Sequence, residues 1–284
     1  KSKLIFDMRG FWIDEKVDNN FINKSKLFDK LLFNFLKKIE NIIFKKSFHI
    51  VVLTHRVKNF LINEKKLNEN KISVICCSVD YDLFENVSKS SIKSSFLSQY
   101  NLPNDAKIIC YCGSIGQYYM INEMLEFYEK IIEKNKNFYF LFITNQIDEL
   151  KLNIRDRKCK DKIIYINSEW RNIPKYLAMS DLMISFIKPT FAKIASSPTK
   201  IGEAFSVGLP IICNKGIGDL DNIIIKNNLG YLVDLENKLY LNNVHNIVCD
   251  ALTRNRKEIV DNSKKIFDLK KAKEKYKKIY AQIN

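Results

Sequence analysis

The 284 residues exceed the usual size of one domain and suit two. Forty-six per cent hydrophobic residues, with 19 Phe and 13 Tyr among them, can fill buried cores and exclude a globally disordered chain. Forty-seven Lys and Arg against 32 Asp and Glu give a net charge of +15, which favours nucleic acid, an acidic membrane surface or phosphorylated small molecules as partners.

Short apolar runs alternate with amphipathic stretches along most of the chain. The runs predict strands at Leu4–Met8, His49–Thr54, Ile72–Cys76, Lys107–Cys112, Phe138–Thr144, Lys162–Ile166, Asp181–Phe186, Leu209–Cys213 and Gly230–Val233. Apolar residues at helical spacing predict helices such as Lys24–Lys45 and Met120–Glu133, and a Lys-rich helix over Lys264–Ile283. This alternation indicates parallel sheets with helices on both faces.

The polar stretch Glu85–Lys107 is the predicted domain boundary. Three strands precede it, too few for a complete doubly wound domain, and the strands that follow are enough for one. We predict an incomplete first Rossmann-like domain over residues 1–88, a second over 89–263, and a C-terminal helix over 264–284 that packs back on the first. Because the chain opens on Lys1 rather than Met and runs straight into a strand, we expect the start of the first domain to be missing.

The chain shows neither a signal peptide nor an apolar run near the ~20 residues needed to span a bilayer, so we expect a cytoplasmic protein. Its seven cysteines are odd in number, and several lie inside apolar runs, as is typical of reduced thiols. Cys110 and Cys112 share a strand face, but no second Cys or His pair completes a zinc site. We therefore expect no metal.

A candidate phosphate site begins at Ser197, the predicted N-cap of a helix whose first position is Pro198. The opening turn of such a helix offers free N–H groups and the positive end of the helix dipole, and Lys200 and the preceding Lys193 add positive charge. Glu203, on the same helix face as Lys200, can accept hydrogen bonds from a ribose diol. The alternative is a well-capped surface helix with a solvated Lys and Glu.

A second candidate loop follows the strand Lys107–Cys112 and contains Gly113, Ser114 and Gly116. A glycine-containing turn between strand and helix lets a phosphate or sugar approach the backbone amides. The loop matches neither standard nucleotide-binding glycine motif, which disfavours a Rossmann dehydrogenase or a P-loop enzyme.

Arg9 follows the strand Leu4–Met8, where charged groups are placed for a cleft. A surface ion pair with Asp7 explains the same pattern. His55 also follows a predicted strand, and it is a weaker candidate.

The segments Ser197–Ala204, Gly208–Ile212 and Gly216–Asp219 together resemble the donor-binding signature of family-four, or group one, glycosyltransferases of the GT-B fold. Phe6–Trp12 resembles a first-domain motif of polysaccharide-building members. The resemblance covers nearly the whole chain. It implies an α/β GT-B architecture of two Rossmann-like domains with parallel sheets, the first incomplete, with the acceptor side on the first domain and the nucleotide sugar on the second.

The resemblance also implies residue roles. Glu203 matches the second glutamate of the family's Glu–seven–Glu motif, which binds the nucleotide ribose. Lys200 is implied to contact the diphosphate, helped by the backbone around Ser197 and Thr199, while the Gly113–Gly116 loop faces the donor from the other side. Ala195 replaces the first glutamate, which puts recognition of the sugar hydroxyls in doubt.

The implied reaction is retaining, metal-independent hexosyl transfer from a nucleotide sugar to a glycan or lipid-linked acceptor, without a cofactor. Lys200 and Glu203 would act on the donor, and Arg9 on the acceptor side. A sugar-nucleotide epimerase of the same architecture and a non-catalytic basic binding protein are the alternatives. A nucleic-acid binder is disfavoured because no recognised motif appears. The apolar and lysine-rich stretch Lys24–Lys45 suggests peripheral contact with the anionic inner face of a membrane.

Overall fold

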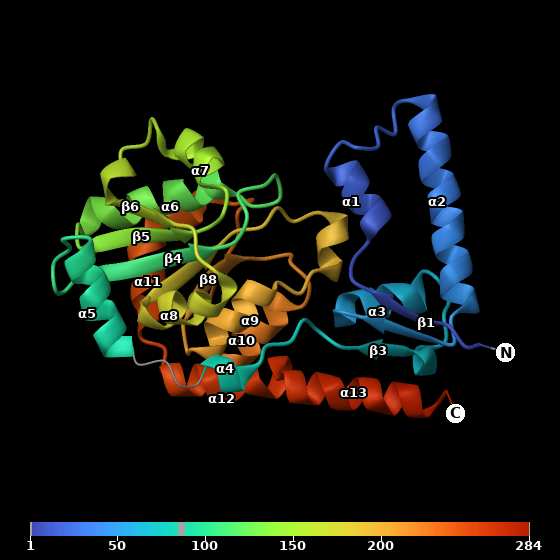
Figure 1. Cartoon of the computed structure of the whole chain (residues 1–284). Helices are drawn as coiled ribbons and strands as arrows, with labels where there is room; N and C mark the ends of the chain where they lie inside the picture. The colour runs from blue at the N-terminus through green and yellow to red at the C-terminus, as the bar shows by residue number, and fades with distance from the viewer. Residues whose placement is uncertain (1, 85–88, 284) are drawn as a thin grey trace.

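A computed structural model describes residues 2–84 and 89–283, which form two α/β parts side by side (Figure 1). The first part holds a parallel sheet in the order β1 (Ile5–Met8), β2 (His49–Val52), β3 (Ile72–Val74). The second holds a parallel sheet in the order β6 (Ile163–Ile166), β5 (Phe138–Ile143), β4 (Lys107–Cys112), β7 (Leu182–Ser185), β8 (Ile211–Asn214), β9 (Gly230–Val233). The predicted class and the predicted strands are confirmed.

Helices flank both sheets. The helices among residues 2–84 are α1 (Trp12–Asp18), α2 (Leu27–Lys46), α3 (His55–Asn63), the 3₁₀ helix η1 (Glu69–Lys71) and α4 (Tyr81–Phe84). Those among residues 89–283 are α5 (Lys89–Gln99), α6 (Ile121–Lys134), α7 (Ile147–Ile154), α8 (Ile173–Met179), α9 (Thr199–Ser206), α10 (Leu220–Asn227), α11 (Val244–Leu252), α12 (Arg256–Phe267) and α13 (Leu269–Ala281). Further 3₁₀ helices are η2 (Lys160–Lys162), η3 (Trp170–Asn172), η4 (Phe191–Ala195) and η5 (Lys238–Asn243).

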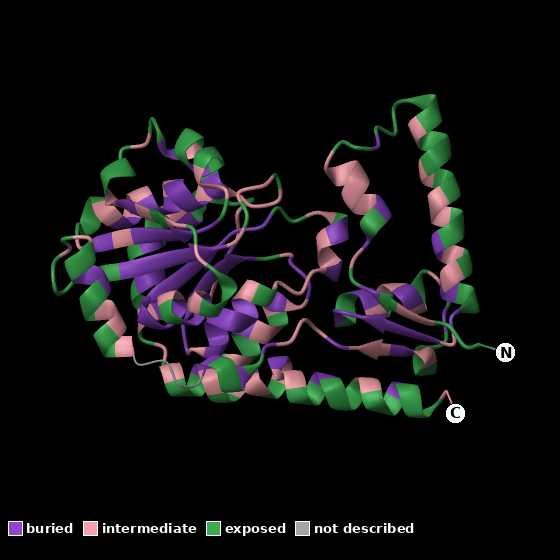
Figure 2. Cartoon of the chain, viewed as in Figure 1, coloured by how far each residue is buried: buried purple, intermediate pink, exposed green. Residues whose placement is uncertain are grey.

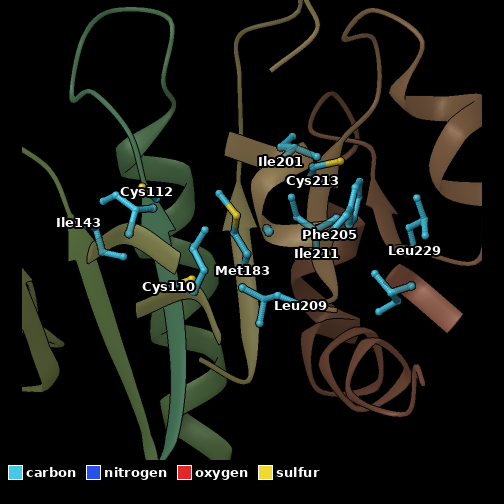
Figure 3. Packing of buried hydrophobic residues seen from close by; sticks show 14 of the residues in the cluster. Cys110, Cys112, Ile143, Met183, Ile201, Phe205, Leu209, Ile211, Cys213 and Leu229 are labelled. Carbon is cyan, nitrogen blue, oxygen red and sulfur yellow. The ribbon is translucent and has the colours of Figure 1, made fainter. Parts of the chain in front are cut away.

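The second sheet is buried on both faces (Figure 2), which is why its strands read as continuous apolar runs. In β4, Cys110 and Cys112 belong to the core on one face, and Ile109 and Tyr111 to the core on the other. Helix α9 packs on the first of these faces, where Figure 3 shows its Ile201 and Phe205 among residues of β4, β7 and β8.

Close packing fixes α9 in place. A Cβ on Gly202 would lie 3.0 Å from Cγ2 of Val79 and 3.5 Å from the ring of Phe267, so a larger residue here would require the Val79 side chain to shift by a few tenths of an ångström. Tyr81 and Phe84 precede the predicted boundary at 88 but are buried in this same core. The chain therefore joins the packing of the second sheet before that position.

The single helix predicted over Lys264–Ile283 is wrong, because the chain leaves helical geometry at Asp268 (φ −63°, ψ 123°). The Asp268 side chain accepts a hydrogen bond from the N–H of Lys270 at 2.9 Å and so caps a new helix, α13. Helix α12 packs on α9, whereas α13 runs under the first sheet (Figure 1), where Ala272 and Ile279 join Val51 and Ile75 in one apolar cluster.

Candidate functional site

The loop after β7 fastens the second part of the molecule to the first. The ring of Phe191 stacks on that of Phe11, with centroids 5.0 Å apart, and Ala192 and Ala195 are buried in the core of the first part. The hydroxyl of Thr54 donates a hydrogen bond to the carbonyl oxygen of Ile194 at 2.8 Å. Ala195, the residue that the sequence resemblance matches to a glutamate, thus lies in apolar packing, where a carboxylate would be desolvated.

The carboxylate of Asp219 makes a second inter-domain contact. Its oxygens accept hydrogen bonds from the N–H of His55 at 2.6 Å and of Arg56 at 3.2 Å. These are N–H groups of the first turn of α3, which have no partner within the helix. A carboxylate at this position also complements the positive end of the helix dipole. The side chain of His55 is exposed, so this residue contributes mainly through its backbone.

The start of α9 differs from the sequence prediction. The helix begins at Thr199 after Pro198, and Ser197 is not its N-cap. The hydroxyl of Ser197 instead accepts a hydrogen bond from the N–H of Cys77 at 3.1 Å, across the domain interface. The N–H groups of Thr199 and Lys200, in the first turn of α9, have no hydrogen-bond partner among the described residues.

A pocket of about 290 Å³ opens beside this helix start and is called here the loop pocket. Its lining includes Arg9, Tyr118, Tyr119, Lys193 and the segment Ser196–Thr199. Four residues predicted for the site, Arg9, Lys193, Ser197 and Thr199, are therefore brought together from both parts of the molecule.

Lys193 is held in the loop pocket by two contacts. Its ammonium group lies 3.0 Å from Oε1 of Glu15 and 3.6 Å from the ring centroid of Tyr118. The Tyr118 hydroxyl donates to the carbonyl oxygen of Glu15 at 3.1 Å. Burial, with the negative charges of Glu15 and Asp18, raises the pKa of Tyr118 to about 12, so this hydroxyl stays protonated at neutral pH.

Arg9 also lines the loop pocket, and its guanidinium lies 2.9 Å from a carboxylate oxygen of Asp7. It also donates to the hydroxyl of Tyr276 on α13, at 3.3 Å. Partial burial lowers the pKa of Arg9, but the charge of Asp7 and the Tyr276 hydroxyl outweigh burial and shift the pKa upward. Arg9 thus forms the surface ion pair with Asp7 and also lies in a cleft, so both interpretations of the sequence apply.

Lys200 and Glu203 pair with each other instead of lining the loop pocket. The Lys200 ammonium lies 2.8 Å from Oε2 and 3.1 Å from Oε1 of Glu203, whose side chain is buried. Both charges act on Cys112 at the end of β4. Burial raises the pKa of this thiol to about 12, while Lys200 lowers it and Glu203 raises it. The pair therefore lies next to the start of the glycine-containing loop.

That loop is held by strand β5 and by the side chains of Tyr111 and Gln146, whose Oε1 accepts a hydrogen bond from the N–H of Ile115 at 2.8 Å. The N–H of Gly113 donates to the carbonyl oxygen of Ile143 at 3.1 Å, and the carbonyl oxygen of Ser114 accepts from the Tyr111 hydroxyl at 2.6 Å. Gly116 lines a separate pocket that includes Lys188. None of Gly113, Ser114 and Gly116 is among the residues lining the loop pocket.

Sequence reasoning missed several residues of the loop pocket and its surroundings, chiefly Glu15, Cys77, Tyr118 and Tyr276. Glu15 belongs to a charged segment that follows β1, and Tyr118 to the loop that follows β4, so their position after a strand was an available signal. Tyr276 approaches only because α13 crosses under the first sheet.

Within residues 2–84 and 89–283, no group of three or more His, Cys, Asp or Glu side chains is arranged to hold a metal ion. No helix in the same ranges combines the length and the apolar character needed to cross a membrane. All seven cysteines are free thiols.

Residues 93–277, well over half of the chain, match the model of the family described as Glycosyl transferases group 1. The chain is a group 1 glycosyltransferase. No curated protein sequence matches this glycosyltransferase, so its relatives are recognised through the family model and through structure.

Solved structures of similar shape confirm the GT-B glycosyltransferase fold. A glycosyltransferase from Rickettsia africae is 21% identical, with a TM-score of 0.66 over 88% of this chain and 67% of its own. HepE from Anabaena, solved with UDP and glucose, is 12% identical, with a TM-score of 0.70 over 98% of this chain and 71% of its own. WaaG, a glycosyltransferase involved in lipopolysaccharide biosynthesis, is 13% identical, with a TM-score of 0.68 over 93% of this chain and 70% of its own.

Proposed function

We propose that this group 1 glycosyltransferase transfers a hexosyl unit from a nucleotide sugar to a glycan or lipid-linked acceptor, with retained configuration and without a metal ion or other cofactor. The observation that carries the proposal is the convergence of Lys193, Arg9 and the N-terminus of α9 on the loop pocket. These groups supply the positive charge that a donor diphosphate needs. The complex of HepE with UDP and glucose supports a nucleotide-sugar donor.

In this proposal the donor diphosphate lies against the N–H groups of Thr199 and Lys200 and the ammonium of Lys193, beside Ser197. Gly113, Ser114 and Gly116 face the donor from the β4 side. Residues 89–263 bind the nucleotide sugar, and residues 1–88 with the C-terminal helix form the acceptor side, where Arg9 lies. A leaving diphosphate is then stabilised by fixed cations and amides, which are in place before the bond breaks.

Glu203 is proposed to receive the nucleotide ribose. Its carboxylate now accepts hydrogen bonds from Lys200. When a diphosphate attracts the Lys200 ammonium, the Glu203 oxygens become available to accept from the two ribose hydroxyls. This exchange keeps the buried carboxylate partnered in both states, which a buried charge requires.

The transfer step needs no protein nucleophile. The bond between the anomeric carbon and the phosphate oxygen breaks, and its electron pair leaves with the nucleoside diphosphate. The acceptor hydroxyl oxygen forms the new bond on the same face, and its proton passes to the departing diphosphate. Lys193 and Lys200 lower the barrier by stabilising the negative charge that develops on that leaving group.

We also propose that the enzyme is cytoplasmic and touches an anionic membrane through α2. Five large apolar side chains of this helix are between 51% and 75% exposed: Leu27, Phe28, Leu31, Phe35 and Ile42. Figure 2 shows α2 exposed along most of its length, standing away from the second part of the molecule. Lysines within and beside it, such as Lys30 and Lys38, suit anionic headgroups. Such contact would bring a lipid-linked acceptor to the first domain.

The donor assignment is tested by calorimetry with UDP and with inorganic pyrophosphate. Lys200→Ala should weaken the binding of both ligands by about 1.5–3 kcal/mol, the range for a charge-assisted contact. Glu203→Ala should weaken the binding of UDP and leave the affinity for pyrophosphate nearly unchanged, because only UDP carries a ribose. Equal losses for both ligands in both variants contradict these roles. Turnover of the nucleotide sugar with and without EDTA tests metal independence.

A further inference from the structure

A second and larger pocket, of about 510 Å³, lies between the two parts of the molecule and is called here the lysine pocket. It shares Leu53, Ser196 and Ser197 with the loop pocket and is otherwise lined by different residues. Its walls come from the ends of β2 and β3, from α10, and from the junction of α12 and α13. Its volume is in the range of small-molecule sites.

Three lysines from three helices line this pocket: Lys226 of α10, Lys265 of α12 and Lys275 of α13. Lys265 donates to Oδ1 of Asn262 at 2.9 Å, and Lys275 to the carbonyl oxygen of Val74 at 3.2 Å. None of the three forms an ion pair with any residue that the structure describes. Their positive charges are therefore not neutralised within this part of the protein.

The pocket has one carboxylate in its described lining, that of Asp219. Both oxygens of this carboxylate already accept hydrogen bonds from the N–H groups of His55 and Arg56. The start of α3 thus offsets the charge of Asp219, and the field inside the pocket is positive.

Half of the other lining residues are polar and half are apolar, and Val74, Ile223, Ile266 and Phe267 are among the apolar ones. A small inorganic anion would leave these side chains without contact. A ligand that satisfies both kinds of wall carries a strongly anionic head and an apolar body.

We infer that the lysine pocket is a second binding site of this protein, for an organic diphosphate with an apolar group, separate from the proposed donor site. Lys226 and Lys265 belong to helices of the second domain, whereas Lys275 belongs to the helix that packs on the first sheet. A diphosphate held by all three lysines bridges the two parts of the molecule. Its binding therefore favours one relative position of the domains over others.

The test is calorimetry with geranyl diphosphate and, as a probe without the apolar body, inorganic pyrophosphate. The variant Lys226→Gln/Lys265→Gln/Lys275→Gln should weaken geranyl diphosphate by about tenfold or more, since it removes three charge-assisted contacts. The control Lys134→Gln/Lys136→Gln/Lys158→Gln removes the same charge from exposed positions outside the pocket and should leave the affinity within about twofold. Lys226→Gln alone, which breaks no hydrogen bond present in the structure, should weaken binding measurably.

The apolar walls predict that wild-type protein binds geranyl diphosphate more tightly than pyrophosphate at this site. Lys200→Ala should leave the affinity for geranyl diphosphate unchanged while it weakens the binding of UDP. The donor site and the lysine pocket are therefore tested independently of each other. Absence of geranyl diphosphate binding, or equal losses in the pocket variant and the control, overturns the inference. The inference is also overturned if Lys200→Ala lowers the affinity for geranyl diphosphate and the triple lysine variant does not, because this result places the ligand in the donor site.

Discussion

The ammonium group of Lys200 lies 2.8 Å from a carboxylate oxygen of Glu203, one turn further along α9. The Glu203 side chain is only 6% exposed and that of Lys200 34%, so the carboxylate depends on this lysine far more than the lysine depends on it. The two residues with the strongest resemblance to a donor site are therefore bound to each other in this structure.

This pairing predicts non-additive stability. Lys200→Met leaves a buried carboxylate without its partner and should lower the free energy of unfolding by about 1–3 kcal/mol. The double variant Lys200→Met/Glu203→Gln removes the charge as well and should be more stable than Lys200→Met alone. Urea denaturation compares four proteins: the wild type, the single variants Lys200→Met and Glu203→Gln, and the double variant. Simple addition of two destabilising effects in the double variant would show that the pair is not coupled.

Gly218 and Gly116 form a matched pair of glycine substitutions. Gly218 has φ +47°, and a Cβ at this position would lie 1.9 Å from the carbonyl oxygen of Ser196. Gly218→Ala should therefore destabilise the fold by at least ~1–3 kcal/mol and disturb both pockets that Ser196 lines. At Gly116 a Cβ meets nothing within 4 Å, so Gly116→Ala should leave the stability of the fold nearly unchanged. Thermal unfolding compares the two variants, and similar losses of stability would contradict the assigned strain.

Asp181 predicts a loss of stability in acid. Burial alone would raise its pKa, but hydrogen bonds from Lys93 and from the N–H of Ile108, with the charge of Lys89, outweigh burial and lower it. Because the folded pKa lies below the unfolded value of about 3.9, this contribution is complete above that value and is lost as the pH falls through the folded pKa.

The variant Asp181→Asn should flatten this acid limb when urea denaturation is repeated between about pH 2 and 5. Asp148→Asn is the control, because the Asp148 side chain is 94% exposed. If the free energy of unfolding of Asp181→Asn falls with decreasing pH as steeply as that of the wild type, Asp181 is not the cause of the acid instability.

Helix α2 predicts salt-sensitive binding to anionic liposomes. Lys30→Gln/Lys38→Gln should reduce co-sedimentation with anionic vesicles, each lysine contributing about 1 kcal/mol near the surface. Leu31→Ser/Phe35→Ser should reduce it through lost apolar insertion, an effect that salt does not reproduce. The lysine control Lys134→Gln/Lys136→Gln should bind as wild type does. Equal binding to neutral and anionic vesicles, or no effect of salt, contradicts the electrostatic attraction proposed here.

The strands could be predicted because buried parallel strands are apolar on both faces, and a run such as Lys107–Cys112 stands out from its surroundings. The break at Asp268 could not, because apolar residues recur at helical spacing on both sides of it. The structure places Asp268 beside Val79, nearly two hundred positions earlier in the chain, and this contact favours two helices over one.

Sites that combine distant segments were the least predictable. The N-cap pattern at Ser197 is sound locally, but the hydroxyl accepts from Cys77, which only the fold brings near. The residues of the lysine pocket range from Leu53 to Lys275 and share no motif. That Arg9 and Lys193 lie at the domain interface could be predicted, because each follows a parallel strand and ligand clefts form at the carboxyl ends of such strands.

The contact between Val79 and Asp268 also has a mechanical consequence. The chain crosses between the two parts near both residues, and the crossings are hydrogen-bonded side by side: the N–H of Val79 donates to Phe267 at 2.7 Å, and the N–H of Leu269 donates to Val79 at 3.0 Å. An opening of the molecule that keeps these two hydrogen bonds rotates about this pair. Helix α1 lies at the other end of the interface from α12 and α13 (Figure 1), so the ion pair between Glu15 and Lys193 is among the first contacts that such a rotation separates.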